Sequence, residues 1–330
     1  MTKIIKINPN NIDADALWEA AEILKGGGLC AFPTETVYGL GADATNADAV
    51  GKIFLAKGRP QDNPLIVHIS RVDEVYPLVK TIPPKAPFLM ERFWGGPLTL
   101  IMERSDVVAP EVSAGLGTVA IRLVSHPVAN ALIRMSGVPV AAPSANISGR
   151  PSPTAAAHVI QDLMGRVDCI IDGGNTFYGI ESTVLDLTEE VPVILRPGAV
   201  TAEEIRDVIG EVSFGAGEGA PKSPGMKYTH YSPDAEVYGV EYGTKPQINR
   251  DGKTGVLSYG EQNIDADIIL HGGGNAEEYA ACLFYNLREF DARGAKTIYA
   301  VLPPPGGMGD AVRNRLLKAA GGRIIQGEKL

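Results

Sequence analysis

Short apolar runs alternate with stretches of helical periodicity along most of this chain, and this alternation narrows the choice of fold more than any other feature. Residues 13–26 show the helical pattern, because Leu17, Ala20 and Leu24 share one face and glycines end the segment. Residues 29–32 form the first short apolar run, which favours a buried strand. An alternation of this kind is typical of an α/β fold.

The same pattern continues to residue 209. Further strands are expected at 65–69, 98–102, 118–123, 138–142, 168–172, 183–187 and 193–196. Further helices are expected at 46–56, 72–79, 84–93, 127–135, 155–164 and 202–209. Polar, glycine-containing loops follow many of these strands, and ligand sites in such sheets usually lie at the carboxyl ends of strands.

A change of composition divides the chain. Residues 210–233 begin with the glycine-rich composition of a linker, but Ser223–Pro233 is too rich in Lys, His and Tyr for a plain spacer. Beyond it we expect strands at 254–258, 268–270 and 297–302 and helices at 276–292 and 310–319. The sequence therefore predicts a first domain at 1–212, a linker or lid at 213–235 and a small α/β domain at 236–330.

Length, charge and cysteine content limit the class of protein. The chain has 330 residues, 45% hydrophobic residues and a net charge of −9, which describes a globular protein without a basic nucleic-acid-binding surface. Its three cysteines, Cys30, Cys169 and Cys282, form no CxxC pair, so a reducing compartment is expected. We see neither a secretion signal nor a membrane span, and therefore expect a cytoplasmic protein.

Lys57 and Arg59 lie on a loop that leads into the strand at 65–69. Pro60 and Pro64 restrict the backbone of this loop. Two cations in register on a rigid loop suit an anion such as a phosphate. The alternative from these residues alone is a solvated basic loop.

Other polar residues gather in the loops at strand ends. They are Thr34, Thr36, Arg122, Ser144, Asn146 and Arg196. Arg196 could face phosphates together with the two cations of the basic loop, and Ser144 and Asn146 could hydrogen-bond the same nucleotide. The two-pronged fork of Arg122 could hold a carboxylate. For each residue by itself, a surface or helix-capping role is the alternative.

Several familiar motifs fail. Gly252-Lys253-Thr254 lacks the earlier glycine of a phosphate-binding P-loop, and residues 39–44 lack the later acidic residue of a dinucleotide site. The five histidines lack metal-ligand spacing, so no zinc site is predicted. There is no G-x-S-x-G elbow, and Ser144 has no evident base in the sequence.

Taken together, the loops resemble the threonylcarbamoyl-AMP synthase family in its longer, two-domain YrdC-like form. The resemblance rests on Phe32-Pro-Thr-Glu-Thr-Val-Tyr-Gly-Leu-Gly, Lys57-Gly-Arg-Pro, Asn63-Pro-Leu, Ala142-Pro-Ser-Ala-Asn-Ile-Ser-Gly, Ile180-Glu-Ser-Thr-Val and Leu195-Arg-Pro-Gly. Ser223–Pro233 looks like the linker of the two-domain members. The resemblance implies a YrdC-like twisted mixed sheet with helices around a concave site, followed by a small Rossmann-like domain.

The resemblance also implies a nucleotidyltransferase reaction. L-threonine, bicarbonate or CO₂, and ATP with Mg²⁺ would give L-threonylcarbamoyladenylate and pyrophosphate, without a structural metal bound by the protein. Another enzyme would transfer the threonylcarbamoyl group to an adenosine of tRNA, which agrees with the acidic balance of this chain. Neither membrane association nor strong direct binding of nucleic acid is expected.

The family pattern assigns roles to individual residues. By similarity, the threonine-binding residues are Thr36, His68, Arg122, Ala142 and Ser182. The ATP-binding residues are Arg59, Asn63, Thr118, Ser144, Asn146, Ser152, Arg196 and Tyr231. Lys57 and Arg59 would stabilise charge on the phosphates as catalytic residues.

A carbamate and a mixed anhydride are both sensitive to water, so the site should close over them. Residues 227–231 are a hypothetical lid with Tyr231 on the nucleotide, and a structured linker without ligand contact is the alternative. Two other functions stay open: an RNA-binding module, and a regulatory protein whose C-terminal domain does the work. A third, carbamoyl transfer in metallocentre maturation, is disfavoured, because the larger proteins that perform it carry zinc-finger cysteines and an acylphosphatase-like domain, for which three dispersed cysteines and 330 residues leave no room. The sequence leaves open the C-terminal domain's ligand, the oligomeric state, the metal stoichiometry, any general base and direct docking of a partner enzyme.

Overall fold

The computed structural model describes residues 1–215, 230–245, 248–249, 252–260, 264–325 and 328–329. These residues form two compact units. The first unit comprises residues 1–148, 153–177 and the described residues from 181 to 215. The second comprises Gly149–Ser152, Tyr178–Ile180 and the described residues from 230 onward.

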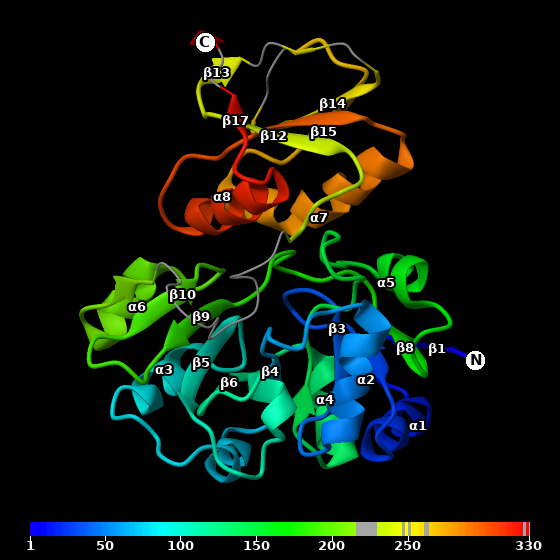
Figure 1. The fold of residues 1–330 in the computed structure, drawn as a ribbon, viewed down its shortest axis with the longest axis vertical. Coiled ribbons are helices and arrows are strands. Elements are labelled where there is room, and N and C mark those ends of the chain that lie inside the picture. Colours follow the sequence, from blue (N-terminus) through cyan, green and yellow to red (C-terminus); the bar gives the residue numbers. More distant parts are fainter. Residues whose placement is uncertain (216–229, 246–247, 250–251, 261–263, 326–327, 330) are drawn as a thin grey trace. The chain divides into compact units, whose positions relative to one another are not determined.

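The first unit is built on one mixed sheet with the order β1-β8-β2-β3-β7-β4-β6-β5-β9-β10-β11 (Figure 1). Its strands are β1 (Lys3–Lys6), β2 (Cys30–Phe32), β3 (Gly39–Asp43), β4 (Ile66–Ile69), β5 (Leu98–Glu103), β6 (Thr118–Leu123), β7 (Val140–Ala141), β8 (Cys169–Asp172), β9 (Thr183–Asp186), β10 (Val193–Arg196) and β11 (Ser213–Phe214). Strands β4 and β6 run parallel, whereas β7 and β5 pair antiparallel to them. The mixed sheet confirms the expected fold class.

Helices cover this sheet. They are α1 (Ala14–Lys25), α2 (Ala47–Lys57), α3 (Ala86–Phe93), α4 (Pro127–Ser136), α5 (Ala156–Leu163) and α6 (Ala202–Ile209), with 3₁₀ helices η1 (Val72–Leu78) and η2 (Pro110–Ser113). The side chain of Asn46 caps the start of α2, and Gly58 ends this helix in the left-handed conformation, with a φ of 61°. Lys57 is therefore the last residue of α2 and not, as expected, part of the loop, and the basic loop begins at Gly58.

Strand β3 was not expected, because the glycines in its sequence are typical of a loop. A Cβ atom on Gly41 would lie 2.6 Å from the ring of Phe32 and 2.7 Å from the side chain of Val140. Glycine is therefore needed at this position for close packing within the sheet. Strand β1 also lies in a segment without an expected strand.

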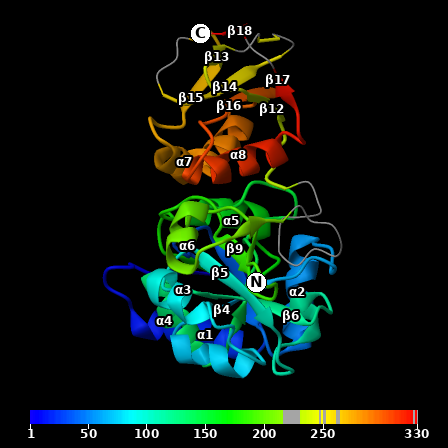
Figure 2. The same cartoon turned by 90° about the vertical axis from the view of Figure 1, so that its left-hand side faces the viewer.

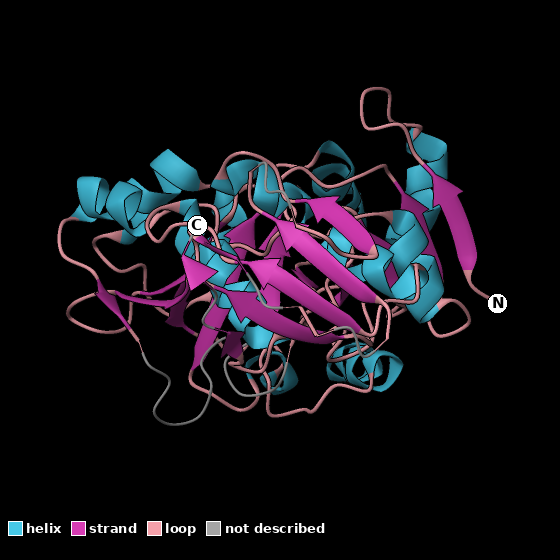
Figure 3. Cartoon of the chain, turned by 90° about the horizontal axis from the view of Figure 1, so that it is seen from above, coloured by secondary structure: helices cyan, strands magenta, loops and turns pink. Residues whose placement is uncertain are grey.

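The second unit contains a parallel sheet with the order β15-β14-β16-β12-β17, whose arrows point the same way in Figure 3. Its strands are β12 (Glu236–Val240), β14 (Thr254–Ser258), β15 (Ile268–His271), β16 (Thr297–Val301) and β17 (Ile324–Ile325). Helices α7 (Ala276–Ala292) and α8 (Met308–Ala319) lie side by side against it (Figure 2). A separate pair joins β13 (Thr244–Lys245) to β18 (Glu328–Lys329). Strand β12 was not expected.

Candidate active site

Strand register places polar side chains next to one another across the large sheet. His68 on β4 lies opposite Arg122 on β6, and on β5 Thr99 precedes Leu100, which pairs with Ile121, the neighbour of Arg122. A hydrogen bond of 2.8 Å joins the hydroxyl groups of Thr99 and Ser182. Side chains at opposed positions project from the same face. We call His68, Arg122, Thr99 and Ser182 the polar row.

Arg122 lies in the middle of the polar row and is 3% exposed. Its Nε donates to the carbonyl oxygen of Gly96 at 3.2 Å, and its Nη1 donates to the hydroxyl of Thr36 at 2.8 Å. Its Nη2 forms an ion pair with the carboxylate of Glu35. A guanidinium group has five N–H donors, so each terminal nitrogen keeps one for a ligand. The fork is thus fixed in place and still able to bind a carboxylate.

Glu35 is a site residue that the sequence reasoning missed. Its second carboxylate oxygen accepts hydrogen bonds of 3.3 Å from the backbone N–H groups of Ser125 and His126, at the start of α4. Burial alone would raise its pKa, but the charge and hydrogen bond of Arg122, together with backbone hydrogen bonds from His126 and from Glu35 itself, hold the pKa of Glu35 below its ordinary value. The sequence did contain a signal for Glu35, namely its position in the Pro-Thr-Glu-Thr motif next to the expected site residue Thr36.

His68 is a neutral member of the polar row. Burial, reinforced by the nearby charge of Arg122, lowers the pKa of His68 to about 3. Its Nδ1 lies 3.1 Å from the carbonyl oxygen of Ile66. At neutral pH this imidazole therefore serves as a polar partner for an uncharged group such as a hydroxyl.

Arg196 joins the end of the polar row. Its Nε donates to the backbone oxygen of Ser182 at 3.0 Å, and its Nη2 donates to the Ser182 hydroxyl at 3.1 Å. The backbone of Ala142 lies at the other end, where its N–H donates to the carbonyl oxygen of Ile66 at 2.9 Å. The expected threonine-binding residues are thereby gathered around one row of the sheet, in contact with one expected ATP-binding arginine.

Lys57 binds the loop that carries two further expected ATP-binding residues. The residue is 1% exposed, and its ammonium group donates to the backbone oxygens of Ser144 and Asn146. The Ser144 hydroxyl donates to the amide oxygen of Asn146 at 2.6 Å. Lys57 therefore fixes the position of this loop, a role that its sequence did not indicate.

Arg59 shapes the basic loop in a similar way. It donates from Nε and Nη2 to the backbone oxygen of Asn63, at 3.3 and 3.2 Å, and from Nη2 to that of Pro64. Asn63 is 1% exposed, and both polar atoms of its amide group lack a hydrogen-bond partner among the described residues. Such orphaned buried groups are costly and point to a bound ligand or water.

The position of Thr118 shows how far the basic loop lies from the polar row. Thr118 begins β6, and Arg122 lies four residues further along the same strand, so both side chains face the same side about 13 Å apart. In the parallel register of β4 and β6, Ala120 pairs with Ile66, the first residue of β4, so Thr118 lies toward the end of β4 that follows the basic loop. Between the two ends lie Ile66, Ala120 and their apolar neighbours on this face. One extended ligand could therefore reach both ends.

Ser152 and Tyr231, the remaining expected ATP-binding residues, belong to the second unit. Tyr231 is 5% exposed, has a φ of 67° and packs its ring 5.1 Å from that of Phe284. Arg315 lies 5.8 Å above the Tyr231 ring. Residue 227, the start of the expected lid, lies outside the described residues, and the lid stays a prediction.

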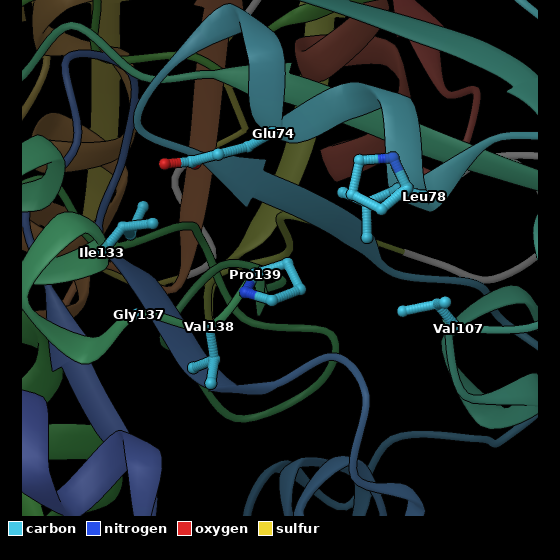
Figure 4. A pocket seen from close by; sticks show the side chains of 8 residues that line it. Glu74, Leu78, Val107, Ile133, Gly137, Val138 and Pro139 are labelled. Atoms are coloured by element: carbon cyan, nitrogen blue, oxygen red, sulfur yellow. The ribbon is translucent and has the colours of Figure 1, made fainter.

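A separate pocket of about 220 Å³ lies elsewhere in the first unit (Figure 4). Its lining is mostly apolar and includes Leu78, Val107, Ile133 and Pro139. The carboxylate of Glu74 at this pocket already accepts two hydrogen bonds of 2.8 Å from Ser70. None of the expected site residues lines it.

Among the described residues, no group of three or more His, Cys, Asp or Glu side chains could hold a metal ion. No described helix combines the length and the apolar character that a bilayer crossing requires.

Two family profiles cover the chain. Residues 22–198 match the Sua5/YciO/YrdC family, described as telomere recombination, and residues 200–321 match the C-terminal domain of threonylcarbamoyl-AMP synthase. Threonylcarbamoyl-AMP synthase of Pyrococcus abyssi is 48% identical over 99% of this chain and 100% of its own length. The Bacillus subtilis protein of the same name is 49% identical, covering 93% of this chain and 94% of its own.

Solved structures agree. The crystal structure of P. abyssi Sua5 complexed with L-threonine has a TM-score of 0.93 and 47% identity, with 98% of this chain and 99% of that chain covered. A variant of P. abyssi Sua5, with a histidine and the adjacent tyrosine changed to alanine, has a TM-score of 0.92 and 46% identity, covering 100% and 99%. The chain belongs to the threonylcarbamoyl-AMP synthase family, a family of enzymes, and the resemblance found in its sequence is confirmed.

Proposed function

We propose that this protein is an L-threonylcarbamoyladenylate synthase that uses L-threonine, bicarbonate or CO₂, and ATP. The observation that carries the proposal is the polar row, in which Arg122 keeps free donors beside Thr36 and His68. A carboxylate, an amine and a hydroxyl are the polar groups of threonine, and the row offers a partner of matching chemistry for each. Arg122 would bind the carboxylate.

The reaction would proceed in two steps. The amine of threonine and bicarbonate first form a carbamate with loss of water. An oxygen of the carbamate then attacks the α-phosphorus of ATP, the bond to the β-phosphate oxygen breaks, and pyrophosphate leaves. The product is a mixed anhydride between the threonylcarbamoyl group and AMP.

The residues around the site would act mainly by positioning and charge stabilisation. Arg59 and Arg196 carry permanent positive charge near the two ends of the site face and would bind phosphates. Lys57 would add its charge while holding Ser144 and Asn146 against the nucleotide. The orphaned amide of Asn63 would gain hydrogen-bond partners when ATP binds.

Mg²⁺ is expected to accompany ATP, and no group of three or more His, Cys, Asp or Glu side chains among the described residues could hold it. Magnesium prefers carboxylate, carbonyl and water oxygens. The carboxylate of Glu35, at the polar row, is committed to Arg122 and to the backbone just before α4. No step of the proposed reaction is therefore assigned to a metal held by this chain.

The product would leave the enzyme for a tRNA threonylcarbamoyl transferase. The mixed anhydride reacts with water, so rapid handover or protection within the site is required. A net charge of −9 is consistent with an enzyme that makes a small activated molecule and leaves tRNA binding to another protein.

The decisive experiment measures pyrophosphate release from ATP, with threonine and bicarbonate omitted one at a time. Release that requires both substrates supports the proposal. Release that ignores threonine would indicate another acceptor or a nucleotide hydrolase. Absence of release together with RNA retention at low salt would favour an RNA-binding module instead.

A further inference from the structure

Helix α7 of the second unit is packed against two short segments from much earlier in the chain. These early segments are Gly149–Ser152 and Tyr178–Ile180, which group with the second unit rather than with the sheet that precedes and follows them. Each early segment contains, or leads into, a serine that is expected to bind a substrate. Ser152 ends the first early segment, and Ser182 follows the second by two residues.

Arg288 on α7 binds the first early segment. Its Nη2 and Nε donate to the carbonyl oxygen of Pro151, at 2.6 and 3.2 Å, and the side chain is 7% exposed. Two donors on one acceptor fix the carbonyl in the plane of the guanidinium group. The peptide bond that carries this carbonyl is the one that leads into Ser152.

The residues that follow the linker bind the same segment. The backbone N–H of Ser232 donates to the carbonyl oxygen of Gly149 at 2.9 Å, and Arg150 forms an ion pair of 2.9 Å with Asp234. Asp291, near the end of α7, accepts a hydrogen bond of 2.9 Å from the backbone N–H of Asp234. The first early segment is therefore held at three successive residues.

Gly179 brings the second early segment onto the same helix. A Cβ atom at this position would lie 2.4 Å from the carbonyl oxygen of Ala280 and 2.5 Å from that of Ala281. Gly179 also has a φ of 72°, which favours glycine. The backbone can reach α7 only because this residue has no side chain.

We infer that α7 is a brace for the active site, and that Arg288 and Gly179 are positioning residues that hold the loops of Ser152 and Ser182. The inference rests on the proposed function, since the ligands of both serines come from it. It gives the C-terminal domain a task that needs no ligand of its own. The brace supports an ATP-binding residue through Arg288, and through Gly179 a residue that contacts Thr99 and Arg196.

The kinetic test compares Arg288→Ala and Arg288→Lys with Arg293→Ala. Arg293 lies just beyond the same helix and forms an exposed ion pair with Glu289, so it is a matched control. Arg288→Ala should raise KM for ATP about tenfold and leave KM for threonine unchanged, since the bonds to Pro151 are lost. Arg288→Lys, or guanidinium ion added to Arg288→Ala, should restore part of the affinity, which a general loss of stability would not allow.

Gly179→Ala gives the complementary result. Its methyl group would push the second early segment off α7, so KM for threonine should rise as well as KM for ATP. Thermal unfolding of each variant shows whether the fold persists. If Gly179→Ala does not fold, the Arg288 series still decides, because unchanged KM for ATP in Arg288→Ala would overturn the brace.

Amide hydrogen exchange separates this inference from the proposed function. Without substrates, peptides that cover residues 144–152 should exchange faster in Arg288→Ala than in wild type or Arg293→Ala. Faster exchange in a protein whose wild type releases no pyrophosphate would keep the brace and reject the reaction. Equal exchange and equal kinetics in an active enzyme would reject the brace and keep the reaction.

Discussion

The two ends of the candidate site are held by different means. At the polar row, His68 and Arg122 are fixed by strand register, and hydrogen bonds join each polar group to a neighbour. At the other end, Ser144 and Asn63 lie on loops whose backbone carbonyls are bound by the buried cations of Lys57 and Arg59. One end is a rigid row, whereas the other is a pair of anchored loops.

This difference matches the ligands proposed for each end. Threonine is small, and a row spaced by strand register can discriminate its three polar groups with little adjustment. A nucleoside triphosphate is long and highly charged. Loops that carry an orphaned group such as the Asn63 amide can adapt to it, and binding offsets the free-energy cost of burying that group. Changes at His68 and Arg122 should therefore affect threonine alone, and changes at the loops of Asn63 and Ser144 should affect ATP alone.

Replacing the central arginine of the row should give the largest effect. Arg122→Lys keeps the charge beside Glu35 but removes the fork, so KM for threonine should rise about 100-fold. KM for ATP should stay within about twofold, since the loops are untouched. Arg134→Lys makes the same change on the exposed side of α4 and should do nothing. If Arg122→Lys changed KM for threonine and KM for ATP equally, the two ends of the site would not bind separate substrates.

The buried imidazole of the row should make folding sensitive to acid. The pKa of His68 is about 3 in the folded protein and near the ordinary 6.5 in the unfolded chain. Below pH 6.5 the unfolded chain therefore binds the extra proton, and the free energy of unfolding falls as the pH falls towards 3. Between pH 6.5 and about 4.5 the loss from this residue should be about 2 kcal/mol.

Urea unfolding of wild type and His68→Gln at both pH values measures this loss. Other titrating groups are common to the two proteins, so the difference between their pH dependences isolates His68. Parallel pH dependences would contradict a buried, neutral imidazole. The pH profile of KM for threonine should likewise show no step near 6.5 from this residue.

Removing the buried ammonium group tests the loop end. Lys57→Met fills the same volume but leaves the carbonyl oxygens of Ser144 and Asn146 without their donor, so KM for ATP should rise about tenfold. KM for threonine should not change. Lys52 on the same helix donates to the carbonyl oxygen of Gly27 at 2.7 Å, so Lys52→Met is the matched control. Equal effects of the two substitutions would show that α2, rather than the loop, was disturbed.

Local sequence patterns predicted much of the first unit. The periodicity and caps of α1 and α2 lie within each helix, so the expected ranges agree with the structure to within one or two residues. The expected helix at 72–79 is a 3₁₀ helix with Pro77 inside it. Strand β3 was not predicted, because its glycines are needed for packing against residues that are distant in the sequence. Local sequence patterns do not contain this information.

The sequence predicted which residues belong to the candidate site, but it did not predict the contacts that those residues make. The sequence singled out Lys57, but its partner Ser144 lies 87 residues away, so the anchoring of the loop could not be foreseen. Glu35 was overlooked for the same reason, since its partner Arg122 is also 87 residues away. Residue type indicates a chemical role, whereas only the fold shows which groups are already paired.

The substitution with the smallest expected effect is at Asn63. It separates the contribution of this residue to stability from its contribution to ATP binding. Asn63→Ala removes a buried amide that has no partner among the described residues, so the free energy of unfolding should stay the same or rise, by up to about 1 kcal/mol, while KM for ATP rises about fivefold. Asn130→Ala is the control, since its amide donates to the carbonyl oxygens of Ser70 and Val124 at 2.8 and 3.3 Å. That change should cost about 1 kcal/mol of stability and leave KM for ATP as it was. If Asn63→Ala instead behaves like Asn130→Ala, the amide of Asn63 has a structural role, and the loop end is as fully satisfied as the row.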